Sequence, residues 1–266
     1  MSMKRIVLVT LFCIVVTAGV LAFARAAQAS TTLMVHAGAG IRPPLDELGK
    51  RFEQQTGTRV DYNFKGSGCL LADICFSKKG DAYIPGELFY IEQADKRGML
   101  AKSRIVAQMS TVVIVQKGNP KKINSLKDLT RPGLRVGIGD PEAVAVGRAA
   151  NESLVKAGIL GSVKKNIATQ ALNVVELGIG VKLRHLDAAI VWDATAYLFK
   201  NDTEQIDIPA KWRADAPIPV AVLKFSENPR EAEAFMNFLA SKEAEKVFLA
   251  HGYGVPKNKP TSVAKH

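Results

Sequence analysis

The feature that most constrains the fold is a turn of small residues between an extended segment and a helix. Residues 59–64 (RVDYNF) alternate between polar and apolar side chains as a β-strand does, and residues 66–68 (GSG) follow almost at once. Leu70, Leu71 and Ile74 then fall on one face at helical spacing. The first N–H groups of such a helix point outward at the positive end of its dipole. The turn is therefore a candidate anion site that needs no charged side chain.

The same arrangement of strand, small-residue turn and helix is predicted at two other places. Residues 32–35 (TLMV) predict a buried strand, and residues 36–40 (HAGAG) form the turn before a helix that ends at Gly57. Residues 135–138 (RVGI) predict another strand, and residues 139–147 (GDPEAVAVG) open the next helix. In an open α/β sheet, ligands bind where helices begin at the carboxyl ends of the strands.

Strands alternate with helices along the remaining chain, which predicts an α/β fold. The strongest β-strand patterns are residues 108–116 and 217–223, and residues 187–192 predict a further strand. Residues 229–250 predict one long amphipathic helix, and the polar tail after Gly252 is expected to be frayed. The two strongest strands divide the chain into an outer and an inner portion, and each portion is expected to form one lobe.

The first 29 residues have the pattern of an export signal. Residues 1–5 are basic, residues 6–24 contain no charge, and residues 27–29 (AQA) precede Ser30 as a small-x-small cleavage site. We expect export to the periplasm with cleavage after Ala29. Because the apolar stretch is long for a cleaved signal, an uncleaved membrane anchor remains the alternative.

The chain is basic, with 36 Lys and Arg residues against 25 Asp and Glu residues and a net charge of +11. Removal of residues 1–29 lowers the net charge to +8, because that segment contains three basic residues and no acidic residue. A basic protein attracts anions in general. The basic residues are scattered singly or in pairs, so neither a nucleic-acid-binding arm nor a basic helix face is predicted.

Cys69 and Cys75 remain after export into a compartment that permits disulfides. Six positions apart on one helix, their Cα atoms are expected to lie beyond the ~7 Å limit for a disulfide. We expect two thiols, with Cys75 in the core and Cys69 beside the candidate anion site. No Cys or His cluster accompanies them in the sequence, so neither a metal site nor a cofactor is predicted.

The sequence contains little that points to catalysis. Its four histidines do not have the spacing of a metal motif, and a Gly-x-Ser-x-Gly nucleophile motif is missing. Ser67, His36 and Asp81 are the one set from which a catalytic triad could be built. Backbone N–H groups at three helix starts favour a binding protein instead, because such dipoles hold an oxyanion without a buried cation.

Four segments, taken in order, carry a family resemblance. They are residues 35–41 (VHAGAGI), 64–71 (FKGSGCLL), 139–147 (GDPEAVAVG) and 189–193 (AIVWD). This order resembles the molybdate-binding periplasmic proteins of ABC importers, over residues 32–253. The resemblance implies a two-lobed Venus-flytrap fold that closes on a tetrahedral oxyanion, held by main-chain N–H groups and a few hydroxyls.

The resemblance also implies which residues bind. Ser67 matches one binding serine of the family, whereas Gly40 falls where the family has another. Val146 and Val174 match positions that contribute only a backbone N–H, and Trp192 replaces a binding tyrosine, so an indole N–H stands in for a phenol. The complete expected set is Ala39, Gly40, Ser67 and Gly68 from the first lobe and Val146, Gly147, Val174 and Trp192 from the second.

Three charged residues lie near these turns in the sequence. Asp193 directly follows Trp192 and would repel a dianion unless its carboxylate points away. Lys65 and Arg42 are expected to be exposed charges at the rim, although the loss of two of the family's three hydroxyls leaves room for an altered specificity.

The expected organisation is a signal peptide (1–29), a first lobe (30–110 with 220–258), a second lobe (111–219) and a flexible tail (259–266). We expect a monomeric, non-enzymatic solute-binding protein that captures molybdate or tungstate and docks on an ABC transporter permease in the inner membrane. The alternatives are another ligand (sulfate, phosphate, a phosphonate or another small solute), a periplasmic enzyme or sensor domain on the same scaffold, and an adaptor whose ligand site is filled by Trp192.

Overall fold

The structure is a computed structural model that describes residues 31–256. The predicted signal peptide (1–29), its cleavage site after Ala29 and the predicted flexible tail (259–266) lie outside the described residues. Within residues 31–256, every helix is too short or too polar to cross a membrane.

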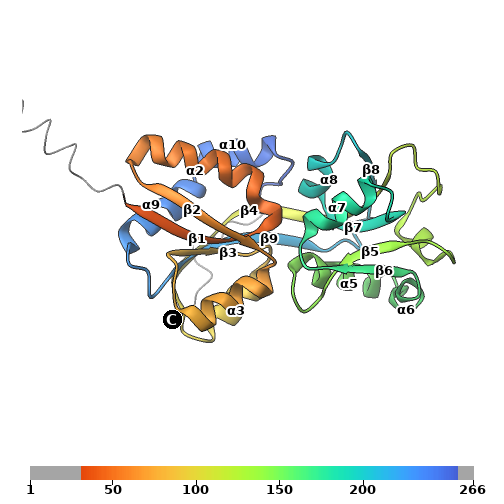
Figure 1. Ribbon diagram of the computed structural model, residues 1–266, viewed down its shortest axis with the longest axis horizontal. Coiled ribbons are helices and arrows are strands. Elements are labelled where there is room, and N and C mark those ends of the chain that lie inside the picture. Colours follow the sequence, from red (N-terminus) through yellow and green to blue (C-terminus); the bar gives the residue numbers. More distant parts are fainter. Residues whose placement is uncertain (1–30, 257–266) are drawn as a thin grey trace, which may run out of the picture. The chain divides into compact units, whose positions relative to one another are not determined.

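The strands of the described chain form one hydrogen-bonded path in which β4 (Leu100–Gln116) is shared by two halves (Figure 1). The first part of β4 pairs with β9 (Asp215–Leu223), and its last residues pair with β7 (Ala188–Trp192) and β8 (Thr203–Asp207), all antiparallel. The first sheet contains, in spatial order, β2 (Arg59–Lys65), β1 (Thr32–Gly38), β3 (Ala82–Ile84), β9 and the first part of β4. The second sheet contains β8, the last part of β4, β7, β5 (Val136–Gly139) and β6 (Ile167–Ala171).

Parallel pairing brings the carboxyl ends of several strands to one edge of each sheet. In the first sheet, β1 pairs in parallel with β2 and β3. In the second sheet, β5 pairs in parallel with β6 and β7. Because a helix follows most of these strands, several helix N-termini gather at these edges, as the sequence predicts.

Helices cover both faces of the first sheet (Figure 1). One face carries α2 (Arg42–Thr56), α9 (Pro229–Leu239) and α10 (Lys242–Ala250), and the other carries α3 (Ser67–Ser77) and α4 (Leu88–Asp95). The 3-10 turn η1 (Ala39–Ile41) leads from β1 into α2. Phe52 of α2 packs edge-on against Phe235 of α9, with ring centroids 5.1 Å apart.

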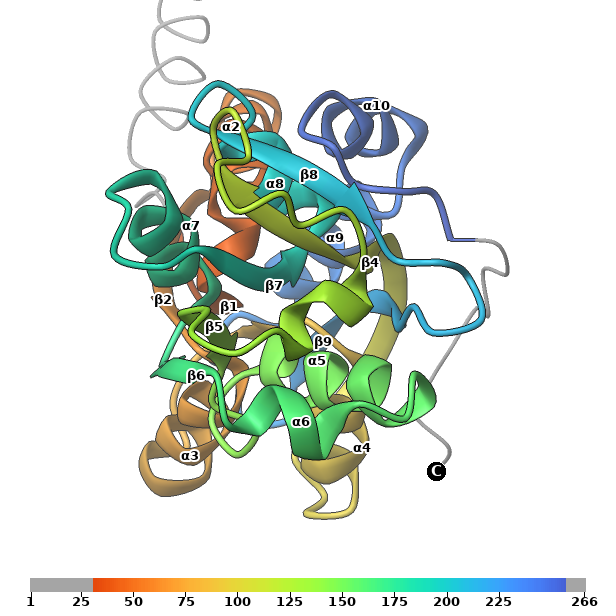
Figure 2. The ribbon, with the colours of Figure 1, turned by 90° about the vertical axis from the view of Figure 1, so that its right-hand side faces the viewer.

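The second sheet is covered in the same way (Figure 2). One face carries α7 (Val174–Lys182) and α8 (Asp193–Leu198), and the other carries α5 (Ala145–Lys156), α6 (Leu160–Lys164) and the 3-10 turn η2 (Leu126–Thr130). Alternate side chains of β4 point to opposite faces. Val112 and Ile114 therefore join one hydrophobic core, whereas Val113 and Val115 join another.

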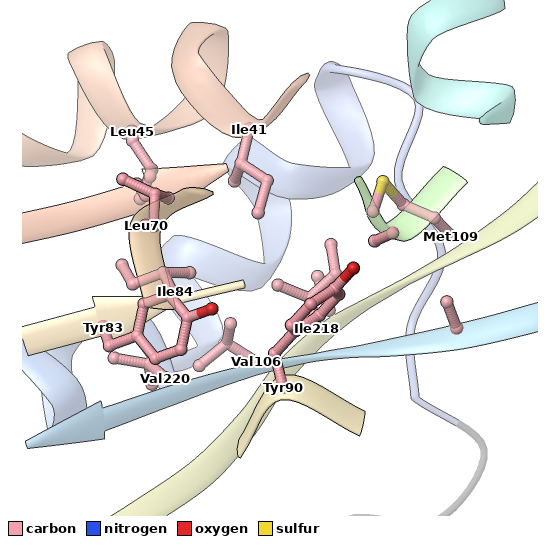
Figure 3. Close-up of a cluster of buried hydrophobic side chains, with 14 of the residues drawn as sticks. Ile41, Leu45, Leu70, Tyr83, Ile84, Tyr90, Val106, Met109, Ile218 and Val220 are labelled. Carbon is pink, nitrogen blue, oxygen red and sulfur yellow. The ribbon is translucent and has the colours of Figure 1, made fainter. Parts of the chain in front are cut away.

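The core beneath α3 holds its first turn in place (Figure 3). Leu70, Tyr83 and Ile84 are fully buried in this cluster. The Tyr83 hydroxyl donates a hydrogen bond to the carbonyl oxygen of Ser67 at 2.7 Å. The turn that opens α3 is thus anchored from below by packing and by one buried hydrogen bond.

The predicted strand–turn–helix units are confirmed, and one predicted helix is wrong. α2 ends where Gly57 takes a left-handed conformation with φ of 77°. Residues 229–250, however, form two helices and not one. Ser241 begins a new helix, because its Oγ accepts a hydrogen bond from the N–H of Ala244 at 3.2 Å.

The expectation of a frayed tail is wrong for the residues just after Gly252. Tyr253 is 4% exposed. Gly254 exchanges two backbone hydrogen bonds with Gln108, at 2.8 and 2.9 Å, and so extends the edge of β4. The short strands β6 and β8 were not predicted from the sequence, because their exposed positions break up the apolar pattern.

Cys69 and Cys75 are both free thiols on α3, as predicted. Cys75 is half-buried against the core, with its Sγ 3.9 Å from the Sδ of Met99.

Candidate ligand-binding site

A small cavity lies where the turns after β1, β2, β5 and β6 meet. Its volume is about 30 Å³, counted as the space open to the centre of a water-sized sphere. That is room for roughly two or three waters, or for one small ion. The lining residues are Gly38, Ala39, Gly40, Ile41, Lys65, Gly66, Ser67, Gly86, Met109, Val144, Ala145, Val146, Asn173, Val174 and Trp192.

Helix N-termini surround this cavity. Ser67 opens α3, Val146 is the second residue of α5, Val174 opens α7, and Gly40 lies in the turn that leads into α2. The first N–H groups of a helix have no acceptor within their own helix. The aligned peptide dipoles add positive potential at the same point. Four such ends around one small cavity create a site for negative charge.

Ser67 supplies a hydroxyl to the cavity. Its side chain is buried, and its Oγ accepts a hydrogen bond from the N–H of Gly86 at 3.0 Å. A hydroxyl that already accepts can still donate its own proton. The Ser67 O–H group can therefore donate to a ligand in the cavity.

Gly66 lets the two sides of the cavity touch. A Cβ atom at this position would lie 2.6 Å from the carbonyl oxygen of Leu172, 2.9 Å from that of Ala143, and against the side chain of Val144. Nearby, the N–H of Gly68 donates to the carbonyl oxygen of Ala143 at 2.9 Å. The turn after β2 is thus in direct contact with the turns after β5 and β6, so the cavity is closed on this side.

The missing hydroxyl at Gly40 has a packing reason. A Cβ atom there would lie 2.8 Å from the Cγ1 of Val174. A serine at position 40 would collide with the Val174 side chain. The close approach of α7 to this turn therefore requires a residue without a side chain at position 40. The carbonyl oxygen of Gly40 accepts a 2.5 Å hydrogen bond from the Tyr253 hydroxyl, which fixes the turn from the other side.

The structure brings together six of the eight predicted binding residues. The residues that line the cavity are Ala39, Gly40, Ser67, Val146, Val174 and Trp192. Gly68 and Gly147 lie at the same helix starts but are not among the lining residues. Their N–H groups are already used, by the carbonyl oxygen of Ala143 at 2.9 Å and by that of Val144 at 3.1 Å.

Several lining residues were not anticipated from the sequence. Asn173 could have been found, because an Asn before an apolar run is a helix-start signal. Its Oδ1 accepts from the N–H groups of Val175 and Glu176 at 3.0 and 3.2 Å. Gly86 and Met109 had no such signal, since they reach the cavity from a loop and a strand only through the tertiary fold.

Lys65 and Arg42, two of the charged residues near the cavity, are held by other partners. Lys65 lines the wall, but its Nζ lies 2.6 Å from the Oδ2 of Asp73. The guanidinium of Arg42 lies over the ring of Phe64, 4.1 Å from its centroid, and Arg42 is absent from the lining. Among the lining residues that the structure describes, none has an acidic side chain.

Asp193 turns away from the cavity. Its Oδ1 accepts a hydrogen bond from the N–H of Ala194 at 2.8 Å, at the start of α8, and the residue does not line the cavity. Burial raises the pKa of this carboxyl group to about 6, although hydrogen bonds from the backbone of Ser110 and Ala194 lower it. Cys69, which was expected beside the site, is also not among the residues that line the cavity.

The three residues considered as a triad do not meet. His36 contacts the carbonyl oxygen of Lys79 at 3.1 Å through Nε2. Asp81 accepts from the N–H of Met34 at 2.8 Å. Ser67 faces Gly86 instead, so this arrangement offers no base to the Ser67 hydroxyl. Over residues 31–256, no cluster of three or more His, Cys, Asp or Glu side chains is placed to hold a metal ion.

Comparisons with known proteins agree with this architecture. A binding protein of Haemophilus influenzae is 28% identical over 221 residues, which cover 83% of this chain and 90% of that protein. The molybdate-binding protein ModA of Mycobacterium tuberculosis is 27% identical over 233 residues, covering 86% of this chain and 87% of ModA. The solved structure of the sulfate-binding protein SubI from Mycobacterium tuberculosis superposes with a TM-score of 0.78 at 19% identity, covering 84% and 86% of the two chains.

The family model of the bacterial extracellular solute-binding proteins matches residues 33–254, nearly all of the described chain. The fold is that of the two-lobed periplasmic binding proteins. Relatives in this family are binding proteins, in line with the expectation of a binding protein. This chain belongs to the bacterial extracellular solute-binding protein family.

Proposed function

We propose that this protein captures a small tetrahedral oxyanion, with molybdate or tungstate as the first candidates, for an ABC importer. The observation that carries the proposal is the convergence of four helix N-termini and the Ser67 hydroxyl on one small cavity. Such an arrangement supplies donors and positive potential without a buried cation. A cavity of about 30 Å³ suits an ion of a few heavy atoms better than a sugar phosphate.

The donors favour an anion that carries no proton. A protonated oxyanion donates an O–H of its own and needs an acceptor in the cavity wall. No described lining residue offers a carboxylate, and the side-chain oxygens of Ser67 and Asn173 each already accept from backbone N–H groups, so an O–H donor would find few side-chain acceptors. Molybdate, tungstate and sulfate fit this wall better than phosphate does.

Sulfate is the second candidate. The relatives include a molybdate-binding protein and a sulfate-binding protein, so both ligands occur among proteins of this fold. Ser67 is the one hydroxyl-bearing residue in the lining, and Gly40 and Trp192 replace hydroxyl-bearing residues expected from the molybdate-binding family. With fewer side-chain donors, selectivity depends on the size of the cavity and on the backbone.

We assign residues 31–110 with 215–256 to one lobe and residues 111–214 to the other, which moves the second boundary from the expected 219/220 to 214/215, because residues 215–219 pair with the first part of β4. The chain passes between the two sheets near Thr111 and Ala214, where the N–H of Thr111 donates to the carbonyl oxygen of Ala214 at 2.9 Å. Rotation at these two crossings would open the cavity.

In this account the protein is a monomer in the periplasm, exported by a signal peptide that is cleaved after Ala29, and it is not an enzyme. It hands its anion to a permease in the inner membrane.

A melting scan against molybdate, tungstate, sulfate, phosphate, a phosphonate and a sugar phosphate tests the proposal. A ligand at 100 times its Kd adds ~2.7 kcal/mol of stability. For a chain of this size that raises the melting temperature by roughly 5–10 °C. We expect such a shift with molybdate, tungstate or sulfate, and a smaller one with phosphate.

A flat response to all six compounds would contradict the proposal. A shift only with the sugar phosphate would contradict the size argument and would indicate a wider ligand site. Turnover of any of these compounds would favour the enzymatic alternative, and loss of that turnover in Ser67→Ala would identify the hydroxyl that carries it.

A further inference from the structure

One ion pair joins the two sides of the molecule beside the cavity. The Nε of Arg148, on α5, donates to the Oε1 of Glu87 at 2.9 Å. Glu87 is the residue that precedes α4, so the contact links the first sheet's helices to those of the second. The Arg148 guanidinium also lies over the ring of Phe89, 3.5 Å from its centroid. We call Glu87, Phe89 and Arg148 the clasp.

The clasp differs from the surface ion pairs in its burial. The side chain of Glu87 is 16% exposed, whereas both partners of the Lys102–Glu233 pair are at least 40% exposed. Removing a carboxylate from water disfavours its charged form. Burial raises the pKa of Glu87 to about 7, although the positive charge and the hydrogen bond of Arg148 lower it.

The clasp lies next to the cavity in both of the chain segments that form it. Gly86, which lines the cavity and donates to Ser67, directly precedes Glu87. Val146, which lines the opposite wall, is two residues before Arg148. A Cβ atom on Gly86 would lie 3.0 Å from the Cβ of Ala145, so the two segments touch. An anion in the cavity and an ionised Glu87 would therefore repel each other.

We propose that capture of the anion is accompanied by uptake of a proton at Glu87, and that Arg148 positions this carboxyl group across the closed cavity. The inference rests on the proposed function, because it needs an anion in the cavity. Glu87 and Arg148 are positioning residues here, since neither lines the cavity.

Four ionisable side chains surround Glu87, and Glu87 is the carboxyl group among them whose pKa burial raises to about 7. Arg148 and Glu152 face it from α5, Tyr90 from α4 and Tyr83 from β3. Burial raises the pKa of both tyrosines, which keeps their phenols neutral. Figure 3 shows Tyr90 among the buried side chains, and its hydroxyl has no hydrogen-bond partner among the described residues.

The sign of the effect follows from linkage. Closure buries Glu87 and the anion adds negative charge beside it, so both raise its pKa in the bound form above that in the open form. The bound form then holds more protons, and affinity falls as the pH rises toward the bound-state pKa. The closed arrangement already places that pKa at about 7 without an anion. Affinity should therefore decrease through neutral pH and level off above it.

Calorimetric titration of the purified protein with molybdate and with sulfate tests this inference. Titrations at about pH 7 in two buffers with different ionisation heats count the protons taken up, and a series from about pH 6 to about pH 8.5 gives the affinity profile. The wild-type protein should take up a fraction of a proton per anion, and its affinity should fall severalfold over the series. Glu87→Gln keeps the shape of the side chain and should take up no proton and give a flat profile.

Two more variants separate the clasp from general structural effects. Arg148→Ala removes the cation that holds the carboxylate ionised, so the midpoint of the profile should move to higher pH, and Arg148→Lys should move it less. Glu233→Gln breaks the exposed pair with Lys102 and should keep the wild-type profile.

Anion binding without proton uptake in the wild type, or an unchanged profile in Glu87→Gln, would overturn this inference and leave the proposed function intact. Failure of both molybdate and sulfate to bind at any pH would overturn the proposed function, and this inference with it.

Discussion

The two sides of the cavity differ in how many of their lining residues are glycine or carry a small side chain. The side formed by the first sheet is lined mainly by residues with small side chains or none, such as Gly40, Gly66 and Ser67, and its larger lining residues are Ile41, Lys65 and Met109. The side formed by the second sheet is lined by Val174, Trp192 and other apolar residues, with Asn173 as its polar member. Bulky side chains of the second side occupy the space that glycines of the first side leave open, as the positions of Val174 against Gly40 show.

This difference separates two tasks. The first side supplies the lining hydroxyl, of Ser67, and the glycines that allow close approach. The second side supplies two helix N-termini and an apolar wall that excludes water, which strengthens the interaction of the N–H dipoles with an anion. Closure should therefore depend on the absence of side chains at the glycines more than on any single polar contact.

Gly66→Ala should have the largest effect on anion binding. The added Cβ would meet the carbonyl oxygens of Leu172 and Ala143 at 2.6 and 2.9 Å, so the two sides cannot close. We expect a loss of affinity of roughly 100-fold, about 2.7 kcal/mol. The backbone at Gly66 is extended, so alanine fits the open protein and the melting temperature without anion should hardly change.

Gly161→Ala is the matched control, because a Cβ there meets nothing within 4 Å. Unchanged affinity in Gly66→Ala would mean that the anion is bound without this closure.

Ser67→Ala should have the next largest effect. It removes a donor to the anion and leaves the Gly86 N–H without its acceptor. We expect an affinity loss of roughly 10-fold and a drop of about 1–3 kcal/mol in unfolding free energy. Titration calorimetry and thermal melting measure the two effects. Ser103→Ala is the control, since its buried hydroxyl has no partner in the described chain and its loss should cost little.

Asp193→Asn should affect stability and leave affinity unchanged. Burial raises the folded-state pKa of Asp193 to about 6, above the unfolded value of about 3.9. The ionised folded form is therefore penalised above the unfolded pKa, and this group should lower the stability of the wild type as the pH rises from about 4 to about 6. The variant should lack that loss, which is roughly 3 kcal/mol at pH 8, because a pKa difference of about two units corresponds to ~2.7 kcal/mol. Melting scans from pH 4 to pH 8 check the sign, and a variant that loses stability in parallel with the wild type would contradict it.

Ser241→Ala should leave anion binding unchanged and lower only the stability. Its Oγ caps α10, far along the chain from either side of the cavity. Loss of the cap should lower the unfolding free energy by about 1 kcal/mol. A change in anion affinity in this variant would show that the helix pair α9 and α10 takes part in closure.

Local patterns predicted the elements that meet at the cavity. Gly57 ended α2 as expected. The small-residue turns before α2, α3 and α5 were predictable because each follows a strand pattern, which is apolar before α2 and α5 and alternating before α3. The break at Ser241 was missed because the apolar stripe continues through it, so the periodicity outweighed a single capping residue.

The site itself was predictable only in part. Gly68 and Gly147 are small residues at helix starts, as the expected binding positions require. Their N–H groups, however, already donate to the carbonyl oxygens of Ala143 and Val144. Which N–H of a helix start remains free depends on contacts between distant turns, and no local pattern encodes these contacts. The same reason hid Gly86 and the partnership of Glu87 with Arg148, 61 positions apart.

The most direct test of the central claim is the amide NMR spectrum during titration with molybdate and with sulfate. If backbone N–H groups hold the anion, the amide signals of Gly40, Ser67, Val146 and Val174 should move strongly and saturate together. Those of Gly68 and Gly147, which already donate to carbonyl oxygens, should move less. Movement confined to Lys65 and Arg42 at the rim, or none at these helix starts, would contradict the account.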